Sequence, residues 1–417
     1  MPDVRSTIEA VWRIESSRLI AALTRYAGDV GTAEDLAQDA LVAALEQWPD
    51  AGIPANPGAW LMTAAKRRAI DAIRRGRMLE RKHAELGIEL TAREAAMPDF
   101  DSAIDDPVGD DLLGLMFITC HPVLAVESRV ALTLRLLGGL TTEEIARAFI
   151  VPVATIAQRI VRAKRTLAEA RVPFEVPRGT ELAARLPPVL SVIYLVFNEG
   201  YSATAGDQWF RSELCHDALR LGRIVAELAP AESEIHGLVA LMELHASRLG
   251  ARTGAAGEPI LLLEQDRSRW DHLLIGRGFA ALDRATRTGH PLGPYALQAA
   301  IAACHARART ADETDWQAIV ALYDALAELT PSPVVELNRA VAVAMAFGPQ
   351  AGLDLVDRLV AESSLRSYHL LPGVRGDLLR RLGRAADARV EFERAASLTA
   401  NEAERKLLLE RAAACGQ

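Results

Sequence analysis

The stretch from Thr141 to Leu167 constrains this chain most, because it has the pattern of two short helices separated by a tight turn. Thr141 and Glu144 have the spacing of a capping box, which predicts a helix beginning at Thr142. Pro152 cannot continue that helix, but it suits the first turn of a second one. Helical spacing then predicts an inward face made of Ile145, Ala146, Phe149, Val153, Ile156, Ala157, Ile160 and Leu167.

The second of these helices has a polar and basic outward stripe. Arg can bridge two acceptors on guanine and Gln can pair with adenine, so such a stripe suits the major groove of DNA. A solvated helix face has the same composition, and the motif alone does not separate the two interpretations. The residues of the stripe are Thr155, Gln158, Arg159, Arg162 and Arg165.

The length of 417 residues and the composition predict an all-α protein of two or three domains. Half of the residues are hydrophobic, and the many Ala, Leu, Glu and Arg residues favour helix over strand. The net charge of −8 does not favour a nucleic-acid partner, but the distribution of charge does. Between Trp60 and Lys82 eight basic residues stand against two acidic ones, and the helix-turn-helix holds a second basic cluster.

No secretory signal opens the chain, and its longest apolar runs are too short to span a bilayer, so a cytoplasmic protein with no membrane partner is expected. The four cysteines form no C-x-x-C pair, so no disulfide framework, metal or cofactor is predicted. Cys120, Cys215 and Cys304 each precede a histidine, and the three pairs could converge on a metal. Adjacent helical residues point roughly 100° apart, which favours buried thiols with incidental histidines.

Two helices and a loop come before the first basic cluster. The first helix covers residues 8–28, and the second begins at about Ala33 and has one apolar and one polar face. The polar face carries Asp35, Gln38 and Asp39, and it is either solvent-facing or an acidic docking site for a basic partner. Residues 50–58, with two prolines, are predicted to be a loop, and residues 60–77 a basic helix.

Four segments are predicted along the chain. Residues 1–83 hold the helices just described, and residues 84–111 form an acidic linker. From Glu89 to Asp111 eight carboxylates face one basic residue, Arg93. Residues 112–172 form a helical unit that ends with the helix-turn-helix. After a boundary marked by Pro173 and Pro177, residues 173–417 form a long helical extension.

Three stretches resemble regions 2 and 4 of bacterial RNA polymerase sigma factors of the extracytoplasmic-function class. They are AEDLAQDALVAALEQW, NPGAWLMTAAKRRAIDAIRR and LTTEEIARAFIVPVATIAQRIVRAKRTL, in the family's order, within residues 8–170. The run YLVFNEGYSA, residues 194–203, is similar to the subgroup with a large C-terminal extension of tetratricopeptide-like repeats. The resemblance therefore implies a sigma factor with two DNA-binding modules and a helical extension.

The resemblance assigns roles to residues of the first module. In that family the second helix of region 2 docks on the clamp helices of the polymerase β′ subunit, and the matching positions are Asp35, Gln38 and Asp39. The loop of residues 53–57 would capture a base flipped out of the promoter's minus-10 element, with Asn56 as the polar contact. The basic helix would follow the minus-10 phosphates through Lys66, Arg67, Arg74 and Arg77. Relatives usually have asparagine in place of Arg67, so no family contact is carried over to that position. Trp60 is expected to be a core residue rather than a wedge that melts DNA.

Region 4, which the family places against the polymerase β flap, would read the minus-35 element through the stripe Thr155, Gln158, Arg159, Arg162 and Arg165. In the family the linker runs toward the RNA exit channel of the polymerase, and a plain spacer is the other interpretation of this acidic stretch. No separate anti-sigma factor is required if the extension holds the sigma modules inactive.

The extension shows a weak internal repeat. Residues 378–398 have the Leu-Gly pair and spaced Ala and Phe of a tetratricopeptide helix hairpin, and an offset of 35 aligns Gly348 with Gly383. Stacked hairpins present a concave surface, so a protein or peptide ligand is expected there. Asn198, Glu199 and Tyr201 are either ligand contacts or a satisfied helix end, and the second interpretation is favoured.

The sequence has no nucleophile with a base, no paired catalytic acids and no nucleotide-binding loop, so it does not predict an enzyme. The predicted function is promoter recognition and transcription initiation with core RNA polymerase, regulated or stabilised by the extension. The alternative is a stand-alone helix-turn-helix regulator whose C-terminal domain senses a ligand or protein.

Overall fold

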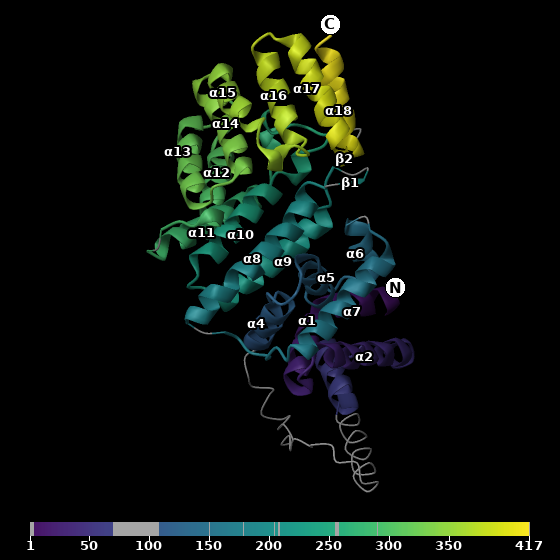
Figure 1. The fold of residues 1–417 in the computed structure, drawn as a ribbon. Coiled ribbons are helices and arrows are strands. Elements are labelled where there is room, and N and C mark those ends of the chain that lie inside the picture. The colour runs from purple at the N-terminus through teal and green to yellow at the C-terminus, as the bar shows by residue number, and fades with distance from the viewer. Residues whose placement is uncertain are drawn as a thin grey trace. The chain divides into compact units, whose positions relative to one another are not determined.

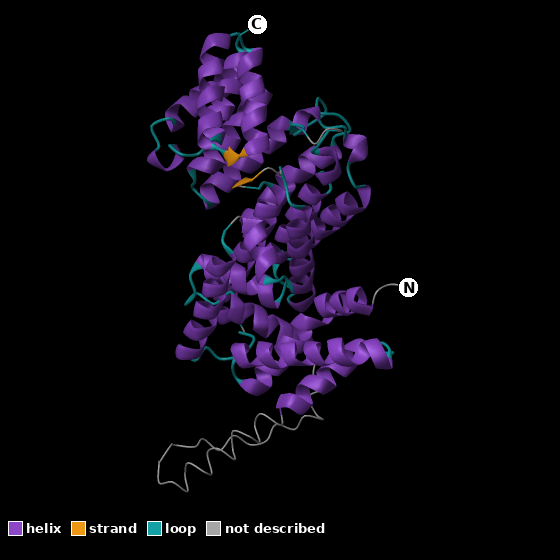
Figure 2. Cartoon of the chain, turned by 90° about the vertical axis from the view of Figure 1, so that its right-hand side faces the viewer, coloured by secondary structure: helices purple, strands orange, loops and turns teal. Residues whose placement is uncertain are grey.

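The computed structural model describes residues 4–69, 108–149, 151–177, 179–203, 205–206, 209–254, 258–289 and 291–416 (Figure 1). Within these ranges the chain is helical except for turns, loops and two strands of two residues each, β1 (Ala205–Gly206) and β2 (Ala400–Asn401) (Figure 2). The prediction of an all-α protein is confirmed. The chain divides into two compact units, residues 1–147 with 151–192 and residues 148–150 with 193–417.

The first unit holds the sigma-like stretches. Its N-terminal helix ends at Gly28, whose φ of +69° is a left-handed conformation that favours glycine. Asp29 then caps the second helix, because its carboxylate accepts hydrogen bonds from the backbone and the hydroxyl of Thr32. The helices are α1 (Val4–Ala27), α2 (Val30–Ala51), a helix through residues 57–69, α4 (Val108–Thr119), α5 (Val126–Leu136), α6 (Thr142–Phe149), α7 (Val153–Glu169) and the first part of α8 (Thr180–Tyr201).

Several predicted boundaries in this unit are wrong by a few residues. Helix α1 begins at Val4 instead of residue 8, the basic helix begins at residue 57 instead of 60, and α4 begins at Val108, within the predicted linker. Helix α2 begins at Val30 instead of Ala33, because the cap at Asp29 starts it earlier. It also includes Pro49 and ends at Ala51, so the loop predicted for residues 50–58 shortens to 52–56. Pro49 has no N–H to donate to the carbonyl four residues back, and α2 ends two residues after it, at Ala51.

The helix-turn-helix has the predicted capping box. The Thr141 backbone N–H donates to the Glu144 carboxylate over 2.8 Å, and the Glu144 N–H donates to the Thr141 hydroxyl over 3.1 Å. Helix α6 begins at Thr142 as predicted, and α7 begins at Val153 directly after Pro152. Val153 and Ala157, however, are exposed rather than inward. The buried face of α7 is narrower than predicted and consists of Ile156, Ile160, Ala163 and Leu167, the side that packs on α5.

The second unit contains the rest of α8 and the following helices. They are α9 (Ser212–Leu228), α10 (Ser233–Ala246), α11 (His272–Arg287), α12 (Pro294–Arg307), α13 (Trp316–Leu329), α14 (Pro333–Phe347), α15 (Pro349–Leu359), α16 (Leu370–Arg381), α17 (Ala385–Leu398) and α18 (Glu402–Ala414). Short 3₁₀ turns cover Leu249–Ala251, Leu262–Glu264, Arg267–Arg269 and Ser363–Leu365.

Helix α10 is the centre of the first half of this unit, because α9, α11 and α12 all pack against it and nearly every one of its residues is buried. Gly237 allows the closest approach: a Cβ there would lie 2.6 Å from the backbone nitrogen and 2.8 Å from the Cα of Ala296 in α12. The nearest atoms belong to the backbone of α12, so a Cβ at position 237 would fit only if α10 and α12 moved apart.

We therefore expect Gly237→Ala to lower the free energy of unfolding by about 1–3 kcal/mol, as other overpacked cores do. Gly276→Ala in α11 is the matched control, because a Cβ at that position meets nothing within 4 Å. Alanine there should stabilise the helix by about 0.5–1 kcal/mol. Urea unfolding of the two variants measures both effects, and changes of the same sign would contradict the assigned close approach.

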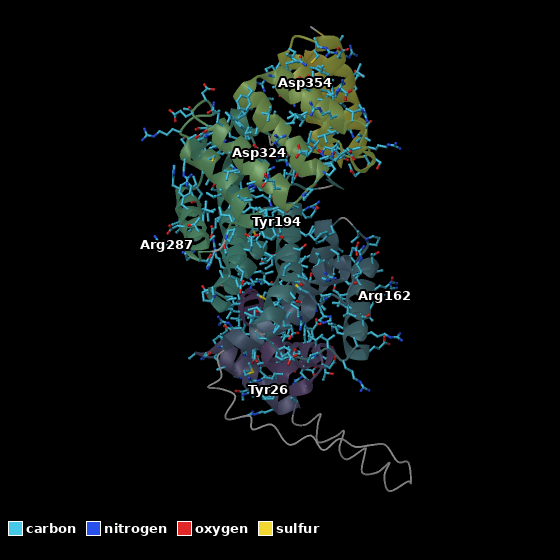
Figure 3. The ribbon with its side chains drawn as sticks, turned by 60° about the vertical axis from the view of Figure 1, so that its left-hand side comes forward. Tyr26, Arg162, Tyr194, Arg287, Asp324 and Asp354 are labelled. Carbon is cyan, nitrogen blue, oxygen red and sulfur yellow. The ribbon has the colours of Figure 1, made fainter. Side chains whose placement is uncertain are left out.

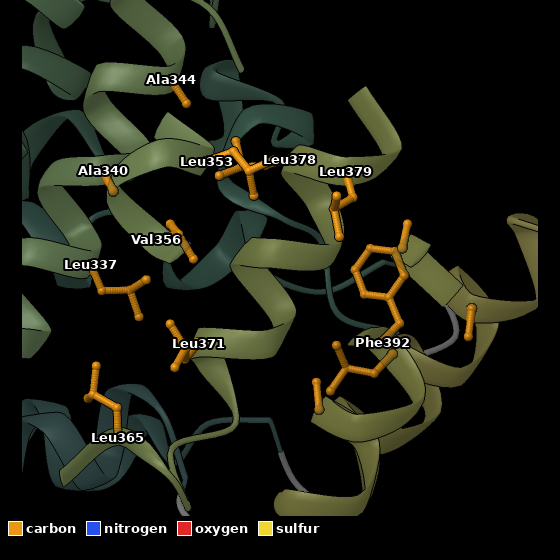
Figure 4. Close-up of a cluster of buried hydrophobic side chains, with 14 of the residues drawn as sticks. Leu337, Ala340, Ala344, Leu353, Val356, Leu365, Leu371, Leu378, Leu379 and Phe392 are labelled. Carbon is orange, nitrogen blue, oxygen red and sulfur yellow. The ribbon is translucent and has the colours of Figure 1, made fainter. Parts of the chain in front are cut away.

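The C-terminal helices form hairpins with the predicted 35-residue offset. Helices α14 and α15 join at Gly348, with φ of +99°, and α16 and α17 join at Gly383, with φ of +78°. Leu337, Leu353 and Leu378 belong to the apolar cluster shared by both hairpins (Figure 4). The repeat read from the sequence therefore corresponds to two successive helix hairpins that pack on one another.

The segment between α17 and α18 contacts the end of the YLVFNEGYSA run. Strand β1 pairs in parallel with β2, and the Asn401 side-chain amide donates to the Ala203 carbonyl over 3.0 Å (Figure 2). Within the run, Glu199 forms an ion pair with Arg211. These contacts agree with the structural interpretation of the run as a satisfied helix end.

Candidate nucleic-acid interface

The outward face of α7 is formed as the sequence predicts. Gln158, Arg162 and Arg165 are exposed, and Thr155 and Arg159 are half-buried beside them. Arg162 lies on the outer side of the helix (Figure 3). The stripe carries three guanidinium groups, two of them exposed, and an amide, which are the groups that read guanine and adenine in a major groove.

Two basic residues of α7 are engaged within the protein. The Arg165 guanidinium contacts the Glu169 carboxylate over 2.6 Å, one helical turn away, in an exposed pair that costs little to open. Lys164 points the other way: its Nζ lies 2.5 Å from the Glu34 carboxylate. The basic cluster seen in the sequence is thus divided between an outward and an inward side.

Glu34 is the functional candidate that the sequence analysis missed. It is 5% exposed, and its carboxylate contacts Lys164 of α7 and Arg135 of α5, the latter over 2.8 Å. Asp29 lies nearby: burial opposes its ionisation, but hydrogen bonds from Thr32 and the charge of Lys164 hold its pKa below the usual value. A buried acidic residue on α2 therefore joins the region-2-like helices to the helix-turn-helix within one compact unit.

The polar face of α2 is accessible. Asp35 and Asp39 are exposed and Gln38 is half-buried, while the opposite face is buried in the core. Asp39 lies 3.5 Å from the Arg68 guanidinium, an exposed contact that a partner could replace. These three side chains form one acidic stripe on the surface of the first unit.

The loop of residues 52–56 and the following helix hold part of the predicted minus-10 set. Asn56 is exposed, and its side-chain oxygen accepts the Ala59 N–H over 3.1 Å, so it caps the helix. Lys66 is half-buried and Arg67 is exposed. Arg74, Arg77 and most of the acidic linker lie outside the described residues.

Trp60 packs edge-on against the buried Trp48, with ring centroids 5.3 Å apart. This contact agrees with its predicted place in the core.

The described residues contain no group of three or more His, Cys, Asp or Glu side chains that could hold a metal ion. Cys120, Cys215 and Cys304 are buried, and burial raises the pKa of each thiol, to about 12 for Cys215. None of the helices in these ranges is both long and apolar enough for a bilayer crossing.

Comparison with known families gives matches to both modules. Residues 13–78 match Sigma-70 region 2, and residues 115–167 match Sigma-70, region 4. Residues 185–286 match a family of unknown function, DUF6596. The acidic stripe on α2 and the exposed stripe on α7 therefore lie within the two sigma matches, one in each.

Whole-chain comparison gives relatives of two kinds. A Rhizobium meliloti (strain 1021) protein named "Uncharacterized protein R00370" is 44% identical over 387 residues, covering 92% of this chain and 90% of that protein. "Probable ECF RNA polymerase sigma factor SigI" of Mycobacterium tuberculosis is 29% identical over 175 residues, covering 40% of this chain and 57% of SigI. "ECF RNA polymerase sigma factor SigK" of Mycobacterium ulcerans is 29% identical over 158 residues, covering 36% of this chain and 78% of SigK.

The helix-turn-helix with its exposed basic stripe, the two sigma regions in their proper order and the similarity to SigI and SigK lead to one assignment. The chain belongs to the extracytoplasmic-function sigma factors, in a form with a helical C-terminal extension that the Rhizobium meliloti protein shares along most of its length.

Proposed function

We propose that this sigma factor docks on core RNA polymerase through the acidic stripe of α2 and reads the minus-35 element through the exposed stripe of α7. The observation that carries the proposal is that each sigma region presents one charged stripe to solvent while its opposite face is buried. Asp35, Gln38 and Asp39 are complementary to a basic surface such as the β′ clamp helices. Region 4 would be positioned by the β flap.

The loop and helix that follow α2 would recognise the minus-10 element. Asn56 would offer its amide nitrogen to a flipped base, and Lys66 and Arg67, with Arg74 and Arg77, would contact phosphates. The extension, residues 173–417, regulates or stabilises these modules in place of a separate anti-sigma factor. Its stacked hairpins support a role in binding a protein or peptide.

The docking role predicts a charge-reversal effect. Replacing both Asp35 and Asp39 with Lys should weaken binding to purified core polymerase by about tenfold or more, because like charges would then face each other. Glu9→Lys is the matched control, since Glu9 is also an exposed carboxylate of the first unit but lies on α1 and not on the stripe of α2. Equal affinities of the two variants would rule out docking through this stripe.

The same assay, extended to run-off transcription, tests the rest of the proposal. A chain that ends at Val192 keeps the first compact unit, and a change in its transcript yield relative to the full chain reports on the extension. The alternative of a stand-alone regulator predicts tight promoter binding without core polymerase. Promoter binding that depends on the core supports the sigma role.

A further inference from the structure

A groove lies in the second unit where α9, α10 and α11 meet, and no role has been assigned to it. Its volume is about 690 Å³, within the range of ligand-binding sites. Four arginines and two glutamates line it, which leaves an excess of two positive charges. The groove falls largely within the segment that matches the family of unknown function.

One wall of the groove is basic along its whole length. Arg277, Arg284 and Arg287 of α11 all line it and are all exposed (Arg287 is labelled in Figure 3). The first and last are ten positions apart on one helix, or about 15 Å at 1.5 Å per residue. A single compact anion cannot contact a row of this length, whereas a chain of several carboxylates can.

The floor of the groove is α10, where two buried side chains each have a free acceptor atom. His236 is 4% exposed, its Nε2 donates to the Pro230 carbonyl over 2.8 Å, and its Nδ1 has no hydrogen-bond partner among the described residues. Glu243 is 2% exposed, Arg223 donates twice to its Oε1, over 2.8 and 2.7 Å, and its Oε2 has no hydrogen-bond partner in the same described part of the chain. With the proton on Nε2, the imidazole Nδ1 is an acceptor, as is the Glu243 carboxylate oxygen, so a ligand that completes this floor must bring donors.

The spacing of the two acceptors indicates what kind of ligand suits them. His236 and Glu243 are seven residues apart on one face of α10, which places them about 10 Å apart along the helix. Backbone N–H groups on one side of an extended peptide recur every second residue, about 7 Å apart, so such a peptide presents a row of donors along this floor. Acidic side chains on such a peptide would pair with the arginines of α11, because guanidinium groups bind carboxylates in a bidentate manner.

We propose that the groove between α9, α10 and α11 binds an extended acidic peptide segment of another protein. The peptide backbone faces α10, and its carboxylates face Arg277, Arg284 and Arg287. This inference rests on the proposed role of the extension in binding a protein, and it names the site and the chemistry of the partner.

The test is fluorescence anisotropy of a fluorescein-labelled hexaglutamate peptide with the full chain and no polymerase. We expect saturable binding that the double variant Arg277→Glu, Arg284→Glu weakens by about tenfold or more, since each lost contact is charge-assisted. Both arginines are exposed, so the variant should keep the far-UV circular dichroism and unfolding midpoint of the parent. Hexaglutamine, which has the same backbone without the charges, should bind much more weakly.

Two controls separate this groove from other basic surfaces. Arg358→Glu, at an exposed arginine of α15, should leave the affinity unchanged. Arg159→Glu with Arg162→Glu tests whether the peptide sits on the DNA-reading face of α7 instead. Absence of binding, equal binding of hexaglutamine, or loss only with the α7 variant would each overturn the groove proposal. Run-off transcription is a separate measurement, so those outcomes leave the proposed sigma function to be judged by its own assay.

Discussion

Replacing Glu34 with Gln is expected to lower the free energy of unfolding by about 2–4 kcal/mol, because it removes the one carboxylate that contacts both Arg135 and Lys164. The carboxylate is 5% exposed, and the two basic side chains are about one-fifth exposed, so solvent compensates only in part. Glutamine has nearly the same shape as glutamate. The loss of stability therefore measures the removal of the charge and not a change in side-chain volume. Thermal or urea unfolding measures it.

The same substitution has a functional consequence that follows from distance. Glu34 ties α2 to α7, and two helices in side-chain contact have axes on the order of 10 Å apart. The minus-10 and minus-35 elements are about 25 base pairs apart by their names, or roughly 85 Å at 3.4 Å per base pair. We expect this paired, closed form of the chain to open at a promoter, because the proposed recognition of both elements needs a larger separation than the ion pair allows.

Glu34→Gln should accordingly shift the free chain toward the open form and raise transcript yield at limiting core polymerase, while stability falls. Glu46→Gln is the control on the same helix, because Glu46 is exposed and should change neither quantity. In a double-mutant cycle with Lys164→Met, the two losses of stability should not add, since both remove one interaction. A Glu34→Gln chain that is destabilised but yields less transcript would contradict the closed-form interpretation.

Local chemistry explains which features could be predicted from the sequence. The capping box at Thr141 and Glu144 and the outward stripe of α7 depend on residues within a few positions of one another, and both were predicted. The prediction that Val153 and Ala157 face inward was wrong. An apolar side chain at helical spacing does not show how much of the surface of α7 the neighbouring helix α5 covers.

Contacts between distant residues explain what could not be predicted. Glu34 lies in a stretch whose other charged residues are also acidic, and nothing near it in the sequence indicates partners 101 and 130 positions away at Arg135 and Lys164. The groove of the extension combines faces of three helices, and the orphan acceptors of His236 and Glu243 become apparent only when α9 and α11 are packed on α10. The hairpin repeat was visible because glycine is required at the left-handed turns of Gly348 and Gly383.

Arg162→Ala is expected to reduce transcription from a promoter with an intact minus-35 element by about 10- to 100-fold, the 1–3 kcal/mol of one bidentate base contact. Arg162 is exposed and has no resolved partner in the described part of the chain, so its removal should leave stability unchanged. Arg165→Ala should have a smaller effect, because Arg165 must first leave Glu169.

Val161→Ala is the matched control for Arg162, since Val161 is the neighbouring residue of α7 and is 66% exposed. Run-off transcription over a set of minus-35 variants distinguishes two kinds of contact. If Arg162 reads a base, Arg162→Ala weakens the preference for one base at one position of the minus-35 element. The fall in transcript yield then disappears on promoters that already lack that base. If it contacts only phosphate, the loss is uniform across sequences and the salt dependence of binding becomes shallower by about one unit of slope. An Arg162→Ala chain that transcribes all variants as the Val161→Ala chain does would show that another face of α7 meets the DNA.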